Sequence, residues 1–238
     1  LFLALSDGAR LDAFRHANAG RISNEQVVVT VEPSDDKCND LLEELRKDVS
    51  DPVAVFRRIV LVDDFTASGT SLVRSESGKW KGKLPKFLRA INRVKLASEP
   101  FELLVHHLIG TPKARDHLAA AIDGCRASEP NLWAKVENAV VPSFGLLYPE
   151  TLPLDATTDS DFVALTQAYY DAGIETSHTL KGGVKHLGLG YAGCALPLVL
   201  DHNTPNNSVA LLWAETEVGK YVGPRQVRPL FRRRQRHS

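Results

Sequence analysis

The sequence predicts an α/β fold in which a parallel sheet is flanked by helices. Strand-like apolar runs alternate with helix-like segments along residues 1–142, in the β-α-β-α-β order that a parallel sheet requires. One run, Ile59–Val62, has four consecutive aliphatic residues between polar ones, which is typical of a strand buried on both faces. The last third differs in character, with many glycines ahead of an apolar run, and we expect it to form a cap or hood.

The first half of the predicted core contains three strands and two helices. The strands are Leu1–Leu5, Val27–Val31 and Ile59–Val62, and the helices are Leu11–Asn18 and Asp36–Val49. The second helix is amphipathic, and we expect its leucines, Leu41, Leu42 and Leu45, to face inward. A further helix is expected to start at Ser71–Arg74.

The second half of the core is predicted from three further segments. These are a strand at Phe101–Leu108, a helix at Pro112–Cys125 and a strand at Val136–Val141. The core is therefore expected to end at residue 142, and residues 143–238 are expected to be a C-terminal cap or extension packed on it, with a helix at Asp161–Ala172. Because His106 and His107 are adjacent in a strand, they point to opposite faces, and at least one is a packing or surface residue.

Composition and charge narrow the class of protein. Lys+Arg and Asp+Glu are equal at 29 each, so no net field attracts nucleic acid or a membrane. No apolar run approaches the ~20 residues of a membrane span. The cysteines at 38, 125 and 194 have no metal or redox spacing, which favours a reducing, cytoplasmic compartment. Because the chain has no Met and begins inside an apolar run, we expect it to be a piece of a longer protein.

The most specific chemical signal is the segment IVLVDDFTASGTS, residues 59–71. Asp63 and Asp64 follow the aliphatic run, at the end of the strand, where ligands gather in parallel α/β sheets. The loop that comes next contains Ala67, Ser68, Gly69, Thr70 and Ser71. Its backbone N–H groups and hydroxyls can all point at one phosphate. The alternative is structural: the acids only end a strand, and a loop hydroxyl only caps a helix.

This segment resembles the phosphoribosyl-pyrophosphate (PRPP) loop of type I phosphoribosyltransferases, in which a hydrophobic strand leads into two acids and a Thr/Ser-Gly-Thr/Ser loop. The resemblance implies a type I-like parallel sheet. It also implies that Asp63 and Asp64 are catalytic and hold the ribose hydroxyls, while the loop from Ala67 to Ser71 holds the 5′-phosphate. Ala67 departs from the family pattern, which usually has Thr there; one hydroxyl is lost, but the backbone donors remain. Mg²⁺ is the implied cofactor, with no direct protein ligand assigned.

A second loop agrees with this resemblance. It follows the first predicted strand and contains Ser6, Asp7, Gly8, Ala9 and Arg10. In type I phosphoribosyltransferases the loop after the first core strand touches pyrophosphate. Gly8 would permit close backbone contact, and Arg10 could make bidentate bonds to a phosphate. A plain strand-to-helix turn with a solvated arginine is the alternative.

Two further segments are candidates for ligand contacts. Lys79, Lys81 and Lys83 lie in a basic, glycine-punctuated insertion that could close over a ligand, with a solvated surface loop as the alternative. Tyr191 lies in the segment GLGYAG, where it could stack on a base, although this motif is weak by itself. The segment HNTPNN, residues 202–207, is interpreted as a turn pinned by its own asparagines.

Several motifs together resemble one branch of the family, the phosphoribosyltransferase-like proteins of bacterial conflict systems. They are SDGAR, ISNEQ, LVDDFTASGTS, GKWKGK, GYAG, HNTPNNS and PLFRRRQRH, and they span essentially the whole chain. Members of that branch occur in antiphage operons, including some retron systems. The resemblance therefore implies an effector, or toxin, that acts on nucleotides.

The expected ligand is PRPP or a nucleotide, bound with Mg²⁺, and the expected reaction is transfer or cleavage at the ribose anomeric carbon. Two other classes stay open: a sensor that binds the same ligand without turnover, and a module that only binds partners. Residues 225–238 hold six arginines and no acid, so they could contact nucleic acid or a protein of the defence system. A homo-oligomer is also left open.

Overall fold

The computed structural model describes residues 1–30, 32–176, 179–184, 186–216 and 228–231. The chain divides into two compact units, Leu1–Tyr148 and Pro149–Ser238. The first unit is a mixed α/β structure, and the prediction of a parallel sheet flanked by helices is confirmed. Most of the arginine-rich segment 225–238 lies outside the described residues.

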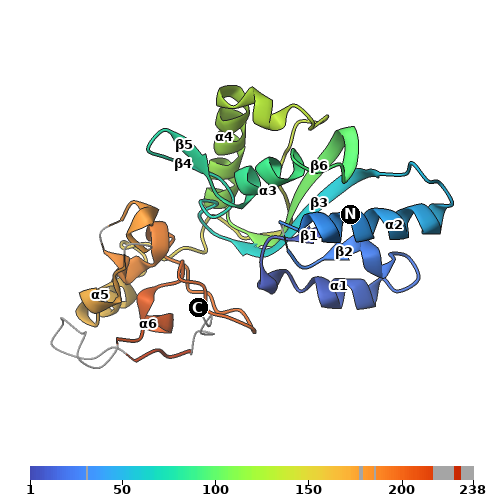
Figure 1. Ribbon diagram of the computed structural model, residues 1–238. Helices are drawn as coiled ribbons and strands as arrows, with labels where there is room; N and C mark the ends of the chain where they lie inside the picture. The colour runs from blue at the N-terminus through green and yellow to red at the C-terminus, as the bar shows by residue number, and fades with distance from the viewer. Residues whose placement is uncertain (31, 177–178, 185, 217–227, 232–238) are drawn as a thin grey trace. The chain divides into compact units, whose positions relative to one another are not determined.

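A five-stranded parallel sheet forms the frame of the first unit (Figure 1). Its strands are β1 (Phe2–Ala4), β2 (Val27–Val28), β3 (Phe56–Thr66), β6 (Ala97–Gly110) and β7 (Ser143–Leu147). They are ordered β2-β1-β3-β6-β7. After β1 the chain adds β2 on one side and then returns to place β3 on the other, so the direction of strand addition reverses between β1 and β3.

The first unit also contains four α-helices, and seven short 3₁₀ turns are distributed over the described residues of both units. The helices of the first unit are α1 (Leu11–Ala17), α2 (Asp35–Val49), α3 (Lys83–Ile91) and α4 (Pro112–Ser128). The 3₁₀ turns are η1 (Asp7–Ala9), η2 (Asn24–Gln26), η3 (Pro130–Trp133), η4 (Ala172–Ile174), η5 (Thr179–Gly182), η6 (Leu187–Leu189) and η7 (Tyr191–Gly193).

Alternation of side chains along the strands divides the core between the two faces of the sheet. One face packs against α1, and its cluster is Ala4, Ala9, Leu11 and Val62, with Phe2, Phe14, Val27 and Val60 against it. The other face packs against α2, α3 and α4. There Leu3, Ile59, Leu61, Leu103 and Val105 of the strands meet Leu41, Phe87, Leu88, Leu118 and Ile122 of the helices. Adjacent residues in a strand therefore belong to different clusters.

The expected helix at Ser71–Arg74 is wrong, because this segment leads into a β-hairpin. Its strands are β4 (Arg74–Glu76) and β5 (Lys79–Lys81), which pair antiparallel. The two residues between them, Ser77 and Gly78, have φ of 53° and 72°, as a two-residue hairpin turn of type I′ requires. Figure 1 shows the hairpin beside α4.

The expected strand at Val136–Val141 is also wrong, since only Val136 forms a bridge, with Phe101. Asn138 explains the difference: its side chain accepts from the Leu103 N–H at 2.9 Å and donates to the Leu103 carbonyl at 2.9 Å, so it takes the place of a strand backbone. The last strand is β7, and the first compact unit therefore ends at Tyr148, where the sequence placed the end of the core at residue 142.

The second unit has little regular structure. Its helices are α5 (Ser160–Ala168) and α6 (Ala210–Trp213). The helix expected at Asp161–Ala172 stops early, because the buried Asp171 side chain accepts from the Gly173 N–H at 2.8 Å and begins a 3₁₀ turn. A small apolar cluster holds the unit together, formed by Ile174, Leu187, Ala210, Trp213 and Ala214.

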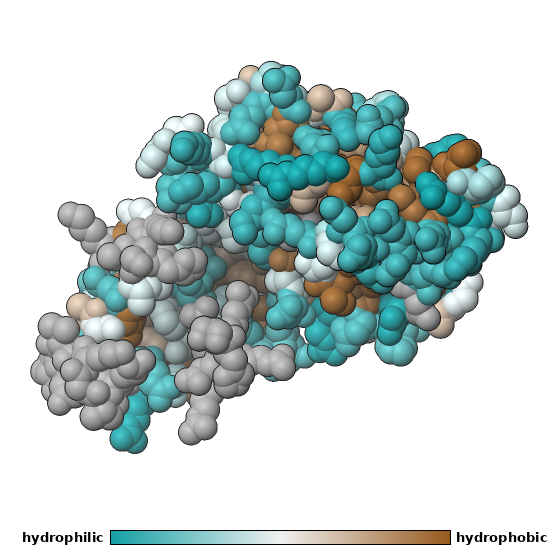
Figure 2. Space-filling view, viewed as in Figure 1, coloured by the Kyte–Doolittle hydropathy of each residue, from teal (hydrophilic) through white to brown (hydrophobic). Residues whose placement is uncertain are grey.

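The surface seen in Figure 2 is hydrophilic over much of the first unit, with hydrophobic areas between. No helix among the described residues is long and apolar enough to cross a membrane. Cys38, Cys125 and Cys194 are all buried. Burial raises the pKa of the Cys38 and Cys125 thiols, which keeps them in the protonated form.

Candidate functional site

The acid pair lies in β3, two residues before its carboxyl end at Thr66, and next to the carboxyl end of β1. β1 pairs with β3 through Phe2, Leu3 and Ala4, so the loop after β1 begins beside Asp63 and Asp64. This is the position at which the direction of strand addition reverses, and in open α/β sheets it is where ligands bind. The two loops that the sequence singled out therefore meet at one place.

Asp63 is buried, with 4% of its surface exposed. Its Oδ1 accepts a hydrogen bond from the Ser6 hydroxyl, and its Oδ2 forms an ion pair with Lys83 Nζ at 2.8 Å. Burial raises the pKa of the Asp63 carboxyl, but Lys83 and Ser6 stabilise the carboxylate, so that the net effect holds the pKa below its ordinary value. Asp63 is thus a fixed anion that connects the β1 loop to the start of α3.

Asp64 is half-buried and lies against the β1 loop. The Ser6 hydroxyl is 3.4 Å from Asp64 Oδ1, so it contacts both acids. A Cβ added to Gly8 would lie 2.3 Å from Asp64 Oδ2, so with any larger residue the carboxylate would have to leave its present position. The structure therefore gives Gly8 a role that depends on Asp64.

The loop after β3 is held by its own hydroxyls and by α4. Ser68 Oγ and Thr70 Oγ1 are 2.9 Å apart and share a hydrogen bond. Gly69 has φ of 74°, and a Cβ there would come within 2.8 Å of His117 and 2.9 Å of Leu118. Ala67 and Ser68 are buried, whereas Ser71 is exposed. The loop is thus a tight turn packed on α4, with its last residue at the surface.

The remaining residues of the β1 loop are divided between the core and the surface. Ala9 is buried and forms part of the core with α1, whereas Asp7 and Arg10 are exposed. Arg10 has φ of 46°, and its Nε is 3.5 Å from Asp12 Oδ1. Its guanidinium therefore lies at the surface beside an acid of α1.

The three lysines of the basic insertion are placed in two groups. Lys83 is the first residue of α3 and contacts Asp63, as described above. Lys79 and Lys81 are exposed on the hairpin, where Lys81 Nζ pairs with Glu76 at 2.8 Å. The hairpin is anchored by Trp80, whose Nε1 donates to Ser128 Oγ of α4 at 2.7 Å. Of these three lysines, Lys83 is the one that contacts the acid pair.

His107 also lies beside Asp63. The register of β3 and β6 pairs His107 with Asp63, and 1% of the histidine is exposed. Its ring stacks on Phe144 with centroids 5.8 Å apart. Burial lowers the pKa of His107 to about 4; Asp63 opposes this effect and Lys83 adds to it. At neutral pH the imidazole is therefore uncharged.

Tyr191 lies in the second unit, where its backbone is part of a hydrogen-bond network. Its N–H donates to the Asn206 carbonyl at 2.6 Å, and its carbonyl accepts from Asn207 Nδ2 at 3.2 Å. A Cβ on Gly190 would lie 2.4 Å from the Asn207 carbonyl oxygen. The segments GLGYAG and HNTPNN therefore pack on each other, which gives their glycines and asparagines a structural role.

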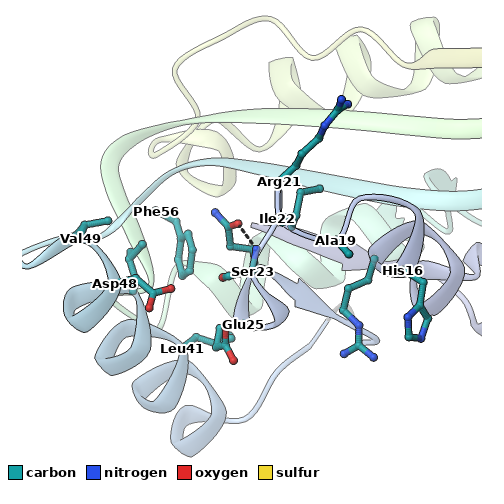
Figure 3. Close-up of a pocket in the computed structure, with 14 residues that line it drawn as sticks. His16, Ala19, Arg21, Ile22, Ser23, Glu25, Leu41, Asp48, Val49 and Phe56 are labelled. Atoms are coloured by element: carbon teal, nitrogen blue, oxygen red, sulfur yellow. Dashed lines mark hydrogen bonds between the residues drawn. The ribbon is translucent and has the colours of Figure 1, made fainter.

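A pocket of about 810 Å³ lies at the other edge of the sheet. Phe56 begins β3 and lines this pocket, together with Leu41 and Asp48 of α2 and with Arg21. Figure 3 shows the Arg21 side chain extending away from Phe56 and Leu41, so its charge is not directed at the apolar floor. The acid pair is at the opposite, carboxyl edge, and we do not assign the site to this pocket.

Sequence reasoning missed Thr111 and the role of His107. The Thr111 hydroxyl accepts from the Ala114 N–H as the cap of α4 and donates to the Ala67 carbonyl. The signal was present, because Thr111 directly precedes Pro112 and both residues follow a strand. What the sequence lacked was the order of the strands, which makes β6 the neighbour of β3.

The described residues contain no group of three or more His, Cys, Asp and Glu side chains that could hold a metal ion. Mg²⁺ commonly takes only one or two carboxylates from the protein and shares the rest of its shell with phosphates and water. A single carboxylate at the acid pair fits that second arrangement. Asp63 is buried and held by Lys83 and Ser6, whereas Asp64 is half-buried, so Asp64 is the better candidate for a shared ligand because it is the more accessible of the two.

A parallel α/β sheet with an acid pair and a Ser-Gly-Thr loop at the point of strand reversal defines a phosphoribosyltransferase-like protein. The family described as PRTase-CE matches residues 19–233, and the chain belongs to this family. Comparison with curated proteins and with solved structures finds no match.

Proposed function

We propose that the first unit binds PRPP or a nucleotide, with Mg²⁺, at the carboxyl edge of β1 and β3, and that it transfers or cleaves at the ribose anomeric carbon. The observation that carries the proposal is the Ser6 hydroxyl, which contacts both Asp63 and Asp64 and so joins the β1 loop to the acid pair. A ligand with a ribose between two phosphate groups matches two phosphate-type loops that flank two acids.

The chemistry of such a site is mainly electrostatic. Displacement at the anomeric carbon passes through a state with positive charge on the sugar, and carboxylates placed near the hydroxyls orient the ring and stabilise that charge. Asp64 would be the carboxylate near the ribose hydroxyls, and the ion pair with Lys83 would fix the neighbouring Asp63. Ser68, Thr70 and Ser71 would bind the 5′-phosphate. Mg²⁺, when bound, supplies positive charge that stabilises the departing pyrophosphate.

A ligand sensor without turnover is the second candidate. It is favoured by one observation: both oxygens of Asp63 already have protein partners, Ser6 and Lys83. A carboxylate used in this way stabilises the fold, and a site built on Asp64 alone could bind a ribose phosphate without promoting its reaction. The same experiment separates the two candidates.

The test is calorimetric titration with PRPP, ribose 5-phosphate and nucleoside monophosphates, with and without Mg²⁺, followed by ³¹P NMR of the products. We expect PRPP to bind, and Asp64→Asn to weaken binding at least tenfold, about 1.4 kcal/mol. Asp116→Asn, an exposed acid on α4, is the matched control and should bind like the wild type. Binding with products supports the enzyme and binding without products supports the sensor; equal affinity of the Asp64 variant and the wild type refutes this site.

We also propose that the protein is an effector of bacterial antiphage defence. This proposal rests on the resemblance of its motifs to proteins of conflict systems and is supported by its membership of the PRTase-CE family. It is tested by expressing the protein with its neighbouring genes and challenging the cells with phage. We expect the wild type to protect the cells and Asp64→Asn not to protect them. If the wild type and the variant protect equally well, defence does not depend on the proposed site.

A further inference from the structure

His107 and Lys83 approach the same carboxylate from different elements. Lys83, at the start of α3, is 2.8 Å from Asp63 Oδ2. His107, on β6, is paired in register with Asp63 on β3, and both residues are buried. Asp63 therefore has one charged partner and, beside it, a second group that can acquire a positive charge.

The imidazole of His107 is not explained by packing alone. Its Nδ1 is buried and makes no hydrogen bond with any residue that the structure describes. An apolar ring at this position would stack equally well on Phe144, whereas a buried polar atom without a partner destabilises the fold. A polar side chain that is kept in such a position is a candidate for a second state in which its polar atom is used.

The charges around His107 decide which state it adopts. The groups that act on it are Asp63 of β3, Lys83 of α3 and His106 of its own strand, and Phe144 of β7 covers its ring. Asp63 favours the imidazolium, whereas Lys83 and His106 disfavour it. As long as Lys83 neutralises Asp63, a proton on His107 would be a surplus charge in a buried place.

Lys83 is able to leave Asp63. Its side chain is 28% exposed, whereas that of Asp63 is 5% exposed, so the ammonium lies on the solvent side of the pair. Its backbone N–H donates to the Ser71 carbonyl at 3.1 Å, which places the residue at the end of the phosphate loop. A four-carbon side chain that starts there can turn from the carboxylate to an anion on the loop.

We propose that His107 is a positioning residue that replaces Lys83 as the cation of Asp63: when Lys83 turns toward a phosphate bound at Ser68–Ser71, His107 takes up one proton from water and holds Asp63 in place. The ligand part of this inference rests on the proposed function, but the exchange of cations does not. In the free protein it can be produced by removing the lysine. Binding of an anionic ligand is then coupled to the uptake of a proton.

The first test needs no ligand. NMR titration of histidine-labelled protein should give His107 a pKa of about 4 in the wild type. In Lys83→Met the imidazole becomes the only cation beside Asp63, and we expect its pKa to rise by about 2 pH units. Lys83→Gln, which keeps a polar side chain, should give the same rise if the methionine variant folds poorly.

Two controls complete this test. His106→Gln and His107→Gln each remove one histidine signal, which assigns the signals of these two residues. In the double variant Asp63→Asn/Lys83→Met the carboxylate that acts on His107 is gone as well, and the pKa of His107 should stay as low as in the wild type. An unchanged pKa of His107 in both lysine variants overturns the proposal, as does a rise that persists in the double variant.

The second test uses PRPP. Calorimetry in buffers of different ionisation enthalpy measures the protons taken up on binding, and at pH 5.5 we expect the wild type to take up about 0.7 proton more than His107→Gln. His106→Gln should match the wild type. Equal uptake by the wild type and His107→Gln overturns the coupling. If PRPP does not bind at all, the proposed function fails, and the titration of the lysine variants still decides the role of His107.

Discussion

The Thr111 hydroxyl donates to the Ala67 carbonyl at 2.6 Å, and the same oxygen accepts from the Ala114 N–H at 3.1 Å. Thr111 is the residue that caps α4, and Ala67 is the first residue of the loop after β3. One buried hydroxyl therefore fixes a helix end and the candidate phosphate loop at once. The position of the loop depends on α4 as much as on its own sequence.

Replacing Thr111 by valine should lower both stability and affinity. Thr111→Val keeps the shape but removes the cap and leaves the Ala67 carbonyl without its donor, at a cost of about 1–3 kcal/mol. Urea denaturation measures the free energy of unfolding, and titration with PRPP measures the affinity. Thr111→Ser should restore most of both. A valine variant as stable as the wild type would show that the loop holds its position without this hydroxyl.

Gly8→Ala should disturb the acid pair. The new Cβ would lie 2.3 Å from Asp64 Oδ2, so either the loop or the carboxylate must move, and overpacking of this kind costs about 1–3 kcal/mol. We expect weaker PRPP binding together with lower stability. Gly20→Ala is the control, because its Cβ would enter open space at φ of 79°, so only backbone strain is added. If both variants bind equally well, the contact of Gly8 with Asp64 has no part in the site.

The Asp63–Lys83 pair should respond unequally to the loss of its two members. Lys83→Met leaves a carboxylate in a buried place, and breaking a buried pair in this way costs about 3–5 kcal/mol. Asp63→Asn should cost less, because the Lys83 side chain is 28% exposed and can turn to water. Denaturation of both single variants and of the double variant gives the coupling energy. The reverse order of the two costs would mean that Lys83 is the more buried member.

Because of His107, the stability should fall with decreasing pH already between pH 6.5 and pH 4, above the pH at which Asp63 is protonated. Its pKa is lowered from 6.5 to about 4, so the unfolded chain binds the proton first and stability is lost as pH falls through this window. The loss attributable to His107 is up to about 3 kcal/mol between pH 6.5 and pH 4. Asp63, whose pKa is below its ordinary value of 3.8, contributes its stabilisation above that pH and loses it only at lower pH.

Denaturation at a series of pH values checks this prediction. His107→Gln cannot take up the proton, so its stability should fall less steeply than that of the wild type between pH 6.5 and pH 4. His106→Gln, which alters the half-buried neighbour on the opposite face, should follow the wild type. Parallel curves for His107→Gln and the wild type would indicate that the imidazole titrates normally in the folded protein.

Loss of Trp80 should release the hairpin. The Trp80 Nε1 bond to Ser128 and the contact of the ring with Gly124 hold β4 and β5 on α4. Trp80→Ala should therefore raise the rate of tryptic cleavage after Lys79 and Lys81 about tenfold or more. Ser128→Ala removes only the hydrogen bond and should have a smaller effect. Cleavage as slow as in the wild type would mean that the β4–β5 turn alone keeps the hairpin ordered.

The sequence was sufficient for the fold class, for most strands and helices of the first unit and for the meeting of the two loops. Periodic apolar runs predicted β1, β3, β6, α1, α2 and α4, and the order of strands and helices predicted a parallel sheet. The sequence ended this strand at Val62 and placed the acid pair directly after it; β3 in fact continues to Thr66, so the acids lie inside the strand, near its carboxyl end. These predictions depend on local pattern, which one sequence contains.

The errors arose where long-range contacts decide the structure. Val136–Val141 has the composition of a strand, but the side chain of Asn138 pairs with the backbone of Leu103, thirty-five residues away in sequence. The strand of this region is instead β7, which begins further along the chain. The pairing of Lys83 with Asp63 depends on the hairpin that brings the start of α3 back to the end of β3. His107 could be assigned to the site only after the strand order was known.

The register between β3 and β6 determines the core and the acid pair together. Val62 pairs with His106 and Asp63 with His107, so a shift of one residue would put His106 beside Asp63 and turn the buried face of β6 outward. The irregularity in this strand pair lies at its other end, between Phe56 and Arg58, far from the acids. An insertion or deletion near Asp63 would therefore disturb the core and the acid pair in one step, whereas a substitution can alter one without the other.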